Sequence, residues 1–220
     1  MNVFIVHAHP EPKSMNGALT RLARDVLQGQ GHTVKVSDLY AMGFDPVSSR
    51  KSFQSVKDQA YFKPQIEEMH AVEQGGFAPD LQAEMDKLRW CDCLIFQFPL
   101  WWFSVPAILK GWVDRVLAMG FAYGYGHIYR EGVFRGKRAM LSLTTGGGPE
   151  MYTPAGANGD IHQILFPIQH GIFYFTGMDV LPPFIAWSPA RITPEQRQAY
   201  LEQYGQRLLA LESTEPIRWE

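Results

Sequence analysis

The 220-residue sequence lacks the features that mark several large classes of protein. Its 20 Lys and Arg residues stand against 22 Asp and Glu residues, and the net charge of −2 argues against a nucleic-acid partner. The uncharged apolar run over residues 94–109 contains two prolines and is shorter than the roughly 20 residues that a membrane-spanning helix needs. The first residues show no basic segment and no signal-peptide cleavage site. We therefore expect a cytoplasmic protein without stable membrane insertion.

Cysteine is scarce as well, because the chain contains only Cys91 and Cys93. In a strand, residues two apart point to the same face, so both sulfurs could contact one metal ion. No second cysteine pair completes a zinc site of the usual kind. We interpret both residues as reduced, structural cysteines and predict no metal site.

The common phosphate-binding motifs are also missing, since neither G-x-G-x-x-G nor G-K-[ST] follows the first predicted strand. That strand instead runs into HAHPEPKSMNGA, residues 7–18, which opens a predicted helix. A helix N-terminus offers free N–H groups to an anion, and Ser14 and Asn16 suit phosphate oxygens. His9 could add a further donor. Taken alone, the segment also fits an ordinary helix cap followed by a loop histidine.

What the sequence does contain is a regular alternation of short apolar runs and amphipathic segments. The predicted strands are residues 2–8, 32–40, 91–98, 137–145 and 178–187. The predicted helices are residues 15–31, 79–90, 105–117, 160–177 and 193–212. Residues 41–79 are predicted to be irregular, which is uncommon at this length and typical of a functional segment.

This alternation predicts the α/β class, with a doubly wound parallel sheet and helices on both faces. Five strands favour the flavodoxin-like strand order 2-1-3-4-5. No internal repeat and no linker divides the chain, so we predict a single domain over residues 1–220. Ligands of such sheets bind outside the carboxyl ends of the strands, at the switch point between strands 1 and 3. The loops after strands 1, 3 and 4 are therefore the candidate site.

The second and third of these loops carry unusual residues. Residues 99–106 place three aromatic side chains in a turn flanked by prolines, where their exposure is costly and a flat ligand would cover them. The third loop, TTGGGPEMY over residues 144–152, has successive glycines that let backbone amides approach a ligand closely. By itself, such a glycine run is also an ordinary turn at the end of a strand.

Together these motifs resemble the NAD(P)H:quinone oxidoreductase family, the DT-diaphorase-like flavoproteins. The resemblance rests on FPLWWFSVPAILKGWVDRV, GFAYGY and LTTGGGPEMYTPAGANGD…LFPIQHGI, together with the HAHPEPKS-N opening and FAPDLQAEMDKL. It runs from residue 2 to about residue 187. The chain ends soon after its last predicted helix, and in this it is similar to the shorter bacterial form of the family.

The resemblance implies a homodimer that binds FAD at the three loops, with two sites at the subunit interface. On the pyrophosphate and adenine side it implies contacts with His9, Ser14, Met15, Asn16 and Ala18. Along the flavin ring it implies Pro99, Leu100, Trp101, Trp102 and Phe103. At the pyrimidine end of the ring it implies Thr144, Thr145, Gly146, Gly147 and Tyr152.

The substrate side follows from the same resemblance. Trp102 and Phe103 would form a stacking surface, and Tyr123 and Tyr125 would close the pocket from the partner subunit. The family pairs the tyrosine that matches Tyr152 with a relay histidine six positions later. Catalytic roles therefore fall by resemblance on Tyr152 and on Asn158, which occupies the position of that histidine and also borders the substrate.

Two departures from the family pattern bear on the chemistry. Asn158 can form hydrogen bonds but cannot carry a proton at neutral pH, so the relay must be shortened, passed to water or replaced. His162 and His127 are possible substitutes, although a structural role is the more common one for such residues. The second departure is Trp101, where the mammalian pattern has a glutamine.

The favoured hypothesis is an FAD-dependent NAD(P)H:quinone oxidoreductase that transfers hydride in two-electron, ping-pong steps. One alternative keeps the site and reduces azo or nitro compounds. Another is an accessory regulatory flavoprotein of a potassium-efflux system, and a third is a flavodoxin-like electron carrier, against which the near-neutral charge argues. FMN in place of FAD, the preference for NADH or NADPH, and the physiological acceptor stay open at this stage.

Overall fold

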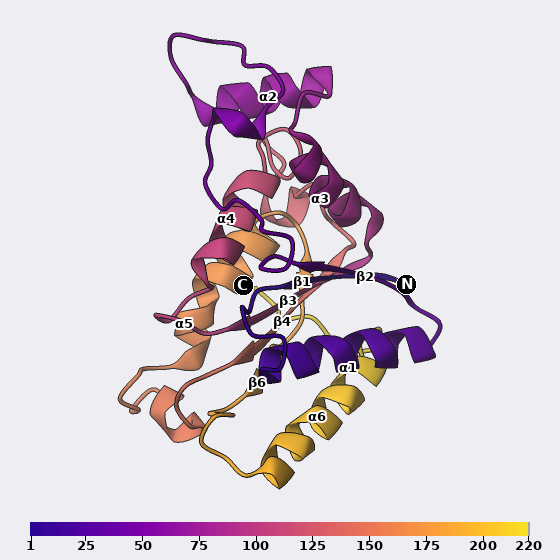
Figure 1. Ribbon diagram of the computed structural model, residues 1–220, viewed down its shortest axis with the longest axis vertical. Helices are drawn as coiled ribbons and strands as arrows, with labels where there is room; N and C mark the ends of the chain where they lie inside the picture. Colours follow the sequence, from indigo (N-terminus) through magenta and orange to yellow (C-terminus); the bar gives the residue numbers. More distant parts are fainter. Residues whose placement is uncertain (220) are drawn as a thin grey trace.

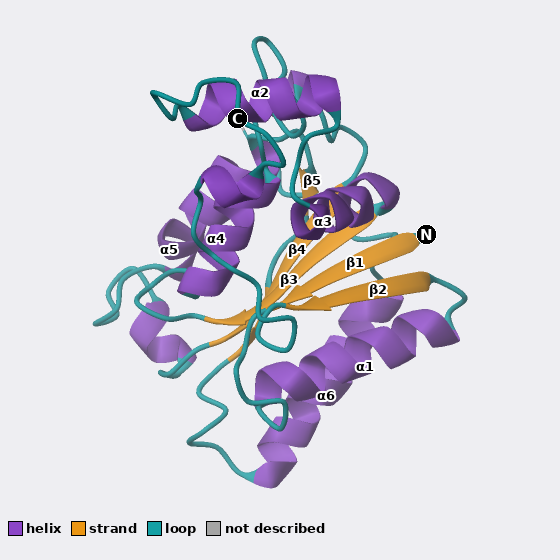
Figure 2. Cartoon of the chain, turned by 45° about the horizontal axis from the view of Figure 1, so that its top comes forward, coloured by secondary structure: helices purple, strands orange, loops and turns teal. Residues whose placement is uncertain are grey.

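The computed structural model describes residues 1–219 and shows a parallel sheet between two layers of helices (Figures 1 and 2). The strands are β1 (Asn2–His7), β2 (Thr33–Asp38), β3 (Cys93–Pro99), β4 (Arg138–Thr144), β5 (Asp179–Val180) and β6 (Phe184–Ala186). The α-helices are α1 (Met15–Gly29), α2 (Pro64–Gln74), α3 (Pro79–Trp90), α4 (Ala107–Val116), α5 (Ile161–Ile168) and α6 (Pro194–Leu209). A π-helix continues α5 over Gln169–Tyr174, and short 3-10 turns cover Arg50–Ser52, Tyr129–Glu131 and Pro149–Tyr152.

The strand order is β2-β1-β3-β4-β5, with β6 also paired to β4, and every pairing is parallel. This confirms the predicted flavodoxin-like arrangement. The switch point lies between β1 and β3, where β1 pairs with β2 on one side and β3 on the other. Because all strands run the same way, the loops after β1, β3 and β4 emerge at one edge of the sheet.

Three helices begin where the local sequence favours a helix start. Ser14 caps α1, since its Oγ accepts from the Gly17 N–H at 3.1 Å. Thr193 caps α6 in a reciprocal box with Gln196, and Pro194 fills the first helical position. Proline also opens α3, whose bounds match the predicted helix over residues 79–90.

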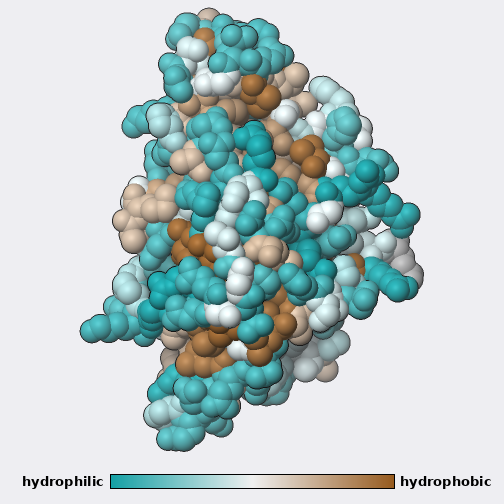
Figure 3. Space-filling model, turned by 90° about the vertical axis from the view of Figure 1, so that its right-hand side faces the viewer, coloured by the Kyte–Doolittle hydropathy of each residue, from teal (hydrophilic) through white to brown (hydrophobic). Residues whose placement is uncertain are grey.

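The two faces of the sheet pack on different cores. α1 and α6 cover one face with a core that includes Ile5, Leu19 and Ile95. The other face packs against α3, α4 and α5 with a larger core built on aromatic rings, among them Phe96 and Trp112. On the part of the outer surface that Figure 3 shows, hydrophilic side chains predominate and hydrophobic ones form separate patches.

The structure differs in detail from three expectations about secondary structure. Residues 41–79 contain α2, which was missed because its apolar residues do not gather on one helical face. The predicted strand over residues 178–187 is broken into β5 and β6, because Pro182 and Pro183 cannot donate to a ladder. The predicted helix over residues 160–177 changes to a π-helix after Ile168, just beyond Pro167.

The two cysteines do not share a face as the strand rule suggested. Cys91 lies before β3, at the end of α3, and belongs to the larger core, whereas Cys93 lies in the core under α1 and α6. Both are free thiols. Burial raises the pKa of Cys91 to about 11 and that of Cys93 to about 12, so both are protonated at neutral pH.

Candidate functional site

The first loop reaches the sheet edge and packs tightly on the start of α1. A β-carbon on Gly17 would lie 2.1 Å from the backbone oxygen of Pro12, so only glycine fits at this close approach. The Ser14 cap leaves the N-terminal end of α1 pointing toward the switch point of the sheet. This end is a favourable place for a negatively charged group because of its free N–H groups and the helix dipole.

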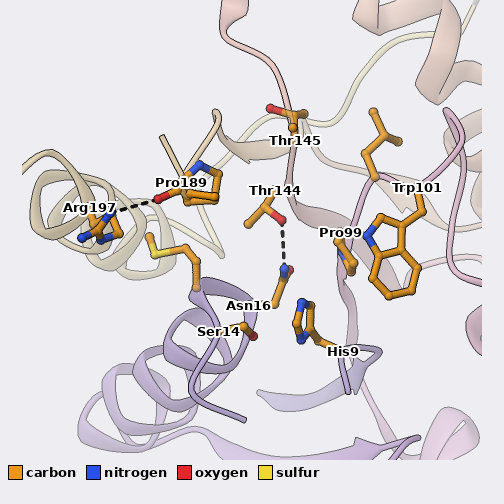
Figure 4. A pocket seen from close by; sticks show the side chains of 13 residues that line it. His9, Ser14, Asn16, Pro99, Trp101, Thr144, Thr145, Pro189 and Arg197 are labelled. Atoms are coloured by element: carbon orange, nitrogen blue, oxygen red, sulfur yellow. Dashed lines mark hydrogen bonds between the residues drawn. The ribbon is translucent and has the colours of Figure 1, made fainter. Parts of the chain in front are cut away.

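A series of buried polar side chains joins β3, the start of α1 and the end of β4, and Figure 4 shows its bond between Asn16 and Thr144. Gln97 Nε2 on β3 donates to Asn16 Oδ1 on α1 at 2.8 Å. Asn16 Nδ2 then donates to Thr144 Oγ1 at the end of β4 at 2.9 Å. All three side chains are buried, so these bonds hold the three loops in register with one another.

The third loop is hydrogen-bonded to both neighbouring strand ends. The Leu100 N–H donates to the Thr144 backbone oxygen at 2.8 Å, and the Thr145 N–H donates to the Ala186 oxygen at 3.2 Å. Within the loop, the Thr145 hydroxyl donates to the Gly147 oxygen at 2.8 Å. A β-carbon on Gly146 would meet no atom within 4 Å, and Gly146 lines the cavity described below. The glycine therefore leaves room for a ligand next to its backbone.

The second loop is a tight turn with unusual backbone angles. Trp101 and Ser104 bond to each other through both backbone pairs, at 3.1 and 3.0 Å. The two residues between them, Trp102 and Phe103, have φ values of 52° and 59°. Bulky residues rarely adopt this left-handed region, and such strain is often found at functional sites. The Trp102 side chain is 95% exposed.

A cavity of about 430 Å³ opens where the three loops meet (Figure 4). Ten of the residues that resemblance assigned to cofactor binding line it, namely His9, Ser14, Met15, Asn16, Pro99, Leu100, Trp101, Thr144, Thr145 and Gly146. Pro189, Ala190 and Arg197 complete the lining and were not predicted. Of the three aromatic residues of the turn, only Trp101 lines the cavity itself.

The missed residues come from the segment after β6 and from the first turns of α6. Arg197 Nη1 donates to the backbone oxygens of Pro189 and Ile192, at 3.1 and 2.6 Å, which holds the guanidinium at the cavity wall. The rule that ligands bind outside the carboxyl ends of the strands applies equally to β6 and would have pointed to this segment. The arginine itself could not be placed from sequence, because α6 presents a polar residue at most positions of its first turns.

The charge of the cavity is set by Arg197 and the start of α1. His9 contributes little positive charge, because burial lowers its pKa below the usual value, outweighing the backbone bond with Glu11 that raises it. His9 Nδ1 lies 3.0 Å from the Glu11 backbone nitrogen and 3.2 Å from the Glu11 backbone oxygen, and these contacts fix the ring near Trp101 with 6.1 Å between ring centroids. The cavity thus combines a flat aromatic wall with one permanent cation.

The predicted catalytic pair lies behind the glycine loop. A β-carbon on Gly147 would lie 3.3 Å from the Tyr152 ring and 3.6 Å from Asn158 Nδ2, so both side chains flank this glycine. Tyr152 is buried against Trp187, with 5.4 Å between ring centroids. Neither Tyr152 nor Asn158 is among the residues that line the cavity.

Several other residues that were predicted to belong to the site lie outside the cavity. Ala18 is in the first turn of α1, and Tyr123 lines a separate pocket beside Phe175. Tyr125 is 87% exposed. His127 and His162 are also exposed, which is the usual situation of a histidine without a catalytic task.

Comparison with known proteins identifies the family. A family model described as "Flavodoxin-like fold" matches residues 1–208. Ribosyldihydronicotinamide dehydrogenase [quinone] of Homo sapiens is 47% identical over 216 residues, which are 98% of this chain and 94% of that protein. The chain belongs to the NAD(P)H:quinone oxidoreductase family. As a member of this family, it is an oxidoreductase.

Two further family members show how far the likeness extends. NAD(P)H dehydrogenase [quinone] 1 of Rattus norvegicus is 44% identical over 97% of this chain and 78% of its own length. A crystal structure from Klebsiella pneumoniae, assigned as a quinone reductase, superposes with a TM-score of 0.96 at 44% identity. It covers 100% of this chain and 88% of the other.

In the present chain, no helix within residues 1–219 is both long and apolar enough to cross a bilayer.

Proposed function

We propose that the protein is an FAD-dependent NAD(P)H:quinone oxidoreductase that works by two-electron hydride transfer in ping-pong order. One observation carries the proposal: a single cavity joins a helix N-terminus, an arginine, a glycine-rich strand end and an aromatic wall. These are the groups that a diphosphate, the polar edge of a flavin and its flat ring would each require. The names of relatives at 44–47% identity support the same reaction.

The residues present fit such a cofactor. The N-terminal end of α1, with Ser14 and Asn16, suits a diphosphate, and Arg197 supplies a countercharge in the same cavity. Gly146 leaves room for the pyrimidine edge beside the Thr144 hydroxyl. The cavity continues past α1 to Pro189, Ala190 and Arg197. This extension favours FAD over FMN, because FMN ends at its first phosphate and has no group to place there.

When bound, the flavin supplies hydride acceptance and donation, and the protein supplies position and electrostatics. Backbone amides of Gly146 and Gly147 and the Tyr152 hydroxyl are donors of the kind that stabilise negative charge at the pyrimidine edge. Proton movement falls to the Tyr152 oxygen, because the Asn158 amide beside it can only donate or accept hydrogen bonds. Trp101 and its turn exclude water from one side of the cavity.

Substrate binding in this proposal needs a second copy of the chain. Tyr123 and Tyr125 lie outside the cavity of their own subunit, and Tyr125 is almost fully exposed. We place both tyrosines over the site of the partner in a homodimer, where a dihydronicotinamide and a quinone would take turns beside Trp102 and Phe103. Light scattering of the purified protein tests the dimer directly.

Steady-state kinetics tests the reaction. NADH, NADPH and dihydronicotinamide riboside are each varied against a benzoquinone, because the related proteins are named for different donors. Ping-pong turnover gives parallel lines in double-reciprocal plots with the preferred donor. Intersecting lines would exclude alternate occupation of one cavity. Absence of quinone reduction with all three donors would overturn the proposed function.

A further inference from the structure

The hydrogen bonds between the buried side chains behind the cavity run in one direction, from Gln97 to Asn16 and from Asn16 to Thr144. Asn16 Oδ1 accepts from Gln97, so its other end, Nδ2, faces Thr144 and donates to the hydroxyl oxygen. Thr144 Oγ1 is then an acceptor in this bond, and its own hydrogen is directed elsewhere. Among the described residues, no protein group accepts that hydrogen, and Thr144 lines the cavity.

From this direction we infer that Gln97 is a positioning residue that makes the Thr144 hydroxyl a hydrogen-bond donor to the flavin. Gln97 is completely buried and does not line the cavity, so it would act only through Asn16 and Thr144. The inference rests on the proposed function, because the group that accepts the hydrogen is the cofactor.

The opposite orientation of the amides is less favourable. Turning both amides around would make the Thr144 hydroxyl donate to Asn16 and would turn the Gln97 NH₂ group away from Asn16. The observed orientation instead leaves the Gln97 Oε1 without a partner among residues 1–219, and an orphaned buried acceptor is less rare than an orphaned donor.

The inference also accounts for polar residues in an otherwise apolar layer. Along β3, Cys93 and Ile95 face α1 and α6 as core residues, but the next residue on that face is Gln97. Along β4, Met140 is followed on the same face by Ser142 and Thr144. Buried polar groups cost free energy unless they are paired, so their place directly behind the cavity indicates a task there.

Gln97→Glu is the most direct test, because it preserves the shape of the side chain and reverses the direction of the hydrogen bonds between residue 97, Asn16 and Thr144. A carboxylate can only accept, so Asn16 would turn its NH₂ group toward residue 97 and its oxygen toward Thr144. The Thr144 hydroxyl would then donate to Asn16 and no longer to the flavin. We expect FAD affinity to fall by about tenfold, the typical value of one hydrogen bond near a charge, and the flavin reduction potential to shift.

A double-mutant cycle separates positioning from a merely structural effect. Thr144→Val removes the hydroxyl, so adding Gln97→Glu to this variant should cause no further change in FAD affinity or flavin reduction potential. Thr144→Ser keeps a hydroxyl, so its FAD affinity and potential should match those of wild type. Thermal unfolding of the flavin-free proteins reports any loss of fold independently. Equal FAD affinity and potential in wild type and Gln97→Glu would overturn the inference, as would additive effects in the cycle. If wild type itself bound no flavin, the proposed function would fail instead.

Discussion

The two faces of strand β3 show different kinds of residue at the same level of the sheet. Phe96 and Phe98 point to the α3–α5 side, where Phe96 contacts Trp112 and Phe173 with ring centroids 5.6 and 4.8 Å apart. On the opposite side the same stretch presents Gln97, which bonds to Asn16. One face contributes to stability through packing. The other face carries, near the end of the strand, polar side chains that lead to the cavity.

The comparison teaches that burial alone does not separate core from site. Gln97 and Phe96 are both fully buried, so a burial pattern treats them alike. They differ in what lies beyond them: Phe96 meets further aromatic side chains, whereas Gln97 leads through two hydrogen bonds to a cavity. Four variants test this difference. Equal effects on stability and on FAD binding from variants on the two faces would contradict it.

The largest effect is expected on the apolar face. Phe96→Ala removes a ring packed against two others and should lower the free energy of unfolding by about 3–5 kcal/mol. The loops that line the cavity are untouched, so the fraction that remains folded should bind FAD as wild type does. Urea unfolding and flavin titration of the same preparation measure both. A large loss of FAD affinity in the folded fraction would show that the two faces are not separable.

Arg197→Gln should do the reverse. It removes the cation at the cavity wall and should weaken FAD binding by about tenfold, since a hydrogen bond to a charged group contributes roughly 1.5–3 kcal/mol. The free energy of unfolding should change little, although the bonds to Pro189 and Ile192 are weakened. Arg197→Lys, which keeps the charge, is the matched control and should bind better than the glutamine variant. Unchanged affinity in both would remove Arg197 from the site.

Trp102→Gly tests the strained turn. Glycine adopts the positive φ of this position without steric cost, so the variant should gain about 1 kcal/mol of stability. Quinone reduction should slow if the exposed ring is a stacking surface. Tyr125→Gly is the control, because Tyr125 is also largely exposed in the single chain but its φ is not positive. Equal stability changes in the two variants would show that the turn stores no strain.

The smallest effect is expected from His7, which lies at the end of β1 and is bonded to Thr20 at 2.8 Å. Burial lowers its pKa below 6.5, with His9 and Arg21 lowering it further and Asp38 opposing the shift. The unfolded chain therefore binds more protons than the folded chain just below pH 6.5, and stability should fall as the pH drops through that window. His7→Asn should flatten this part of the curve. A variant with the same pH dependence as wild type would contradict the assignment.

The sequence was sufficient for the frame of the fold and for most of the cavity lining. A short apolar run predicted β1, and a helix start at Pro79 predicted α3, both almost to the residue. The rule that ligands bind outside the carboxyl ends of the strands pointed to all three loops. It failed where distant residues decide the outcome. α2 has weak amphipathicity, Arg197 reaches the cavity only because α6 packs beside α1, and Gln97 looked like one more core residue of a buried strand.

The central claim is that the carboxyl edge of this sheet holds a flavin with an adenine. It is tested by heating the purified protein, identifying the released cofactor by mass and measuring its amount against the chain. The account predicts FAD, one per chain. A colourless protein that takes up neither FAD nor FMN would contradict it.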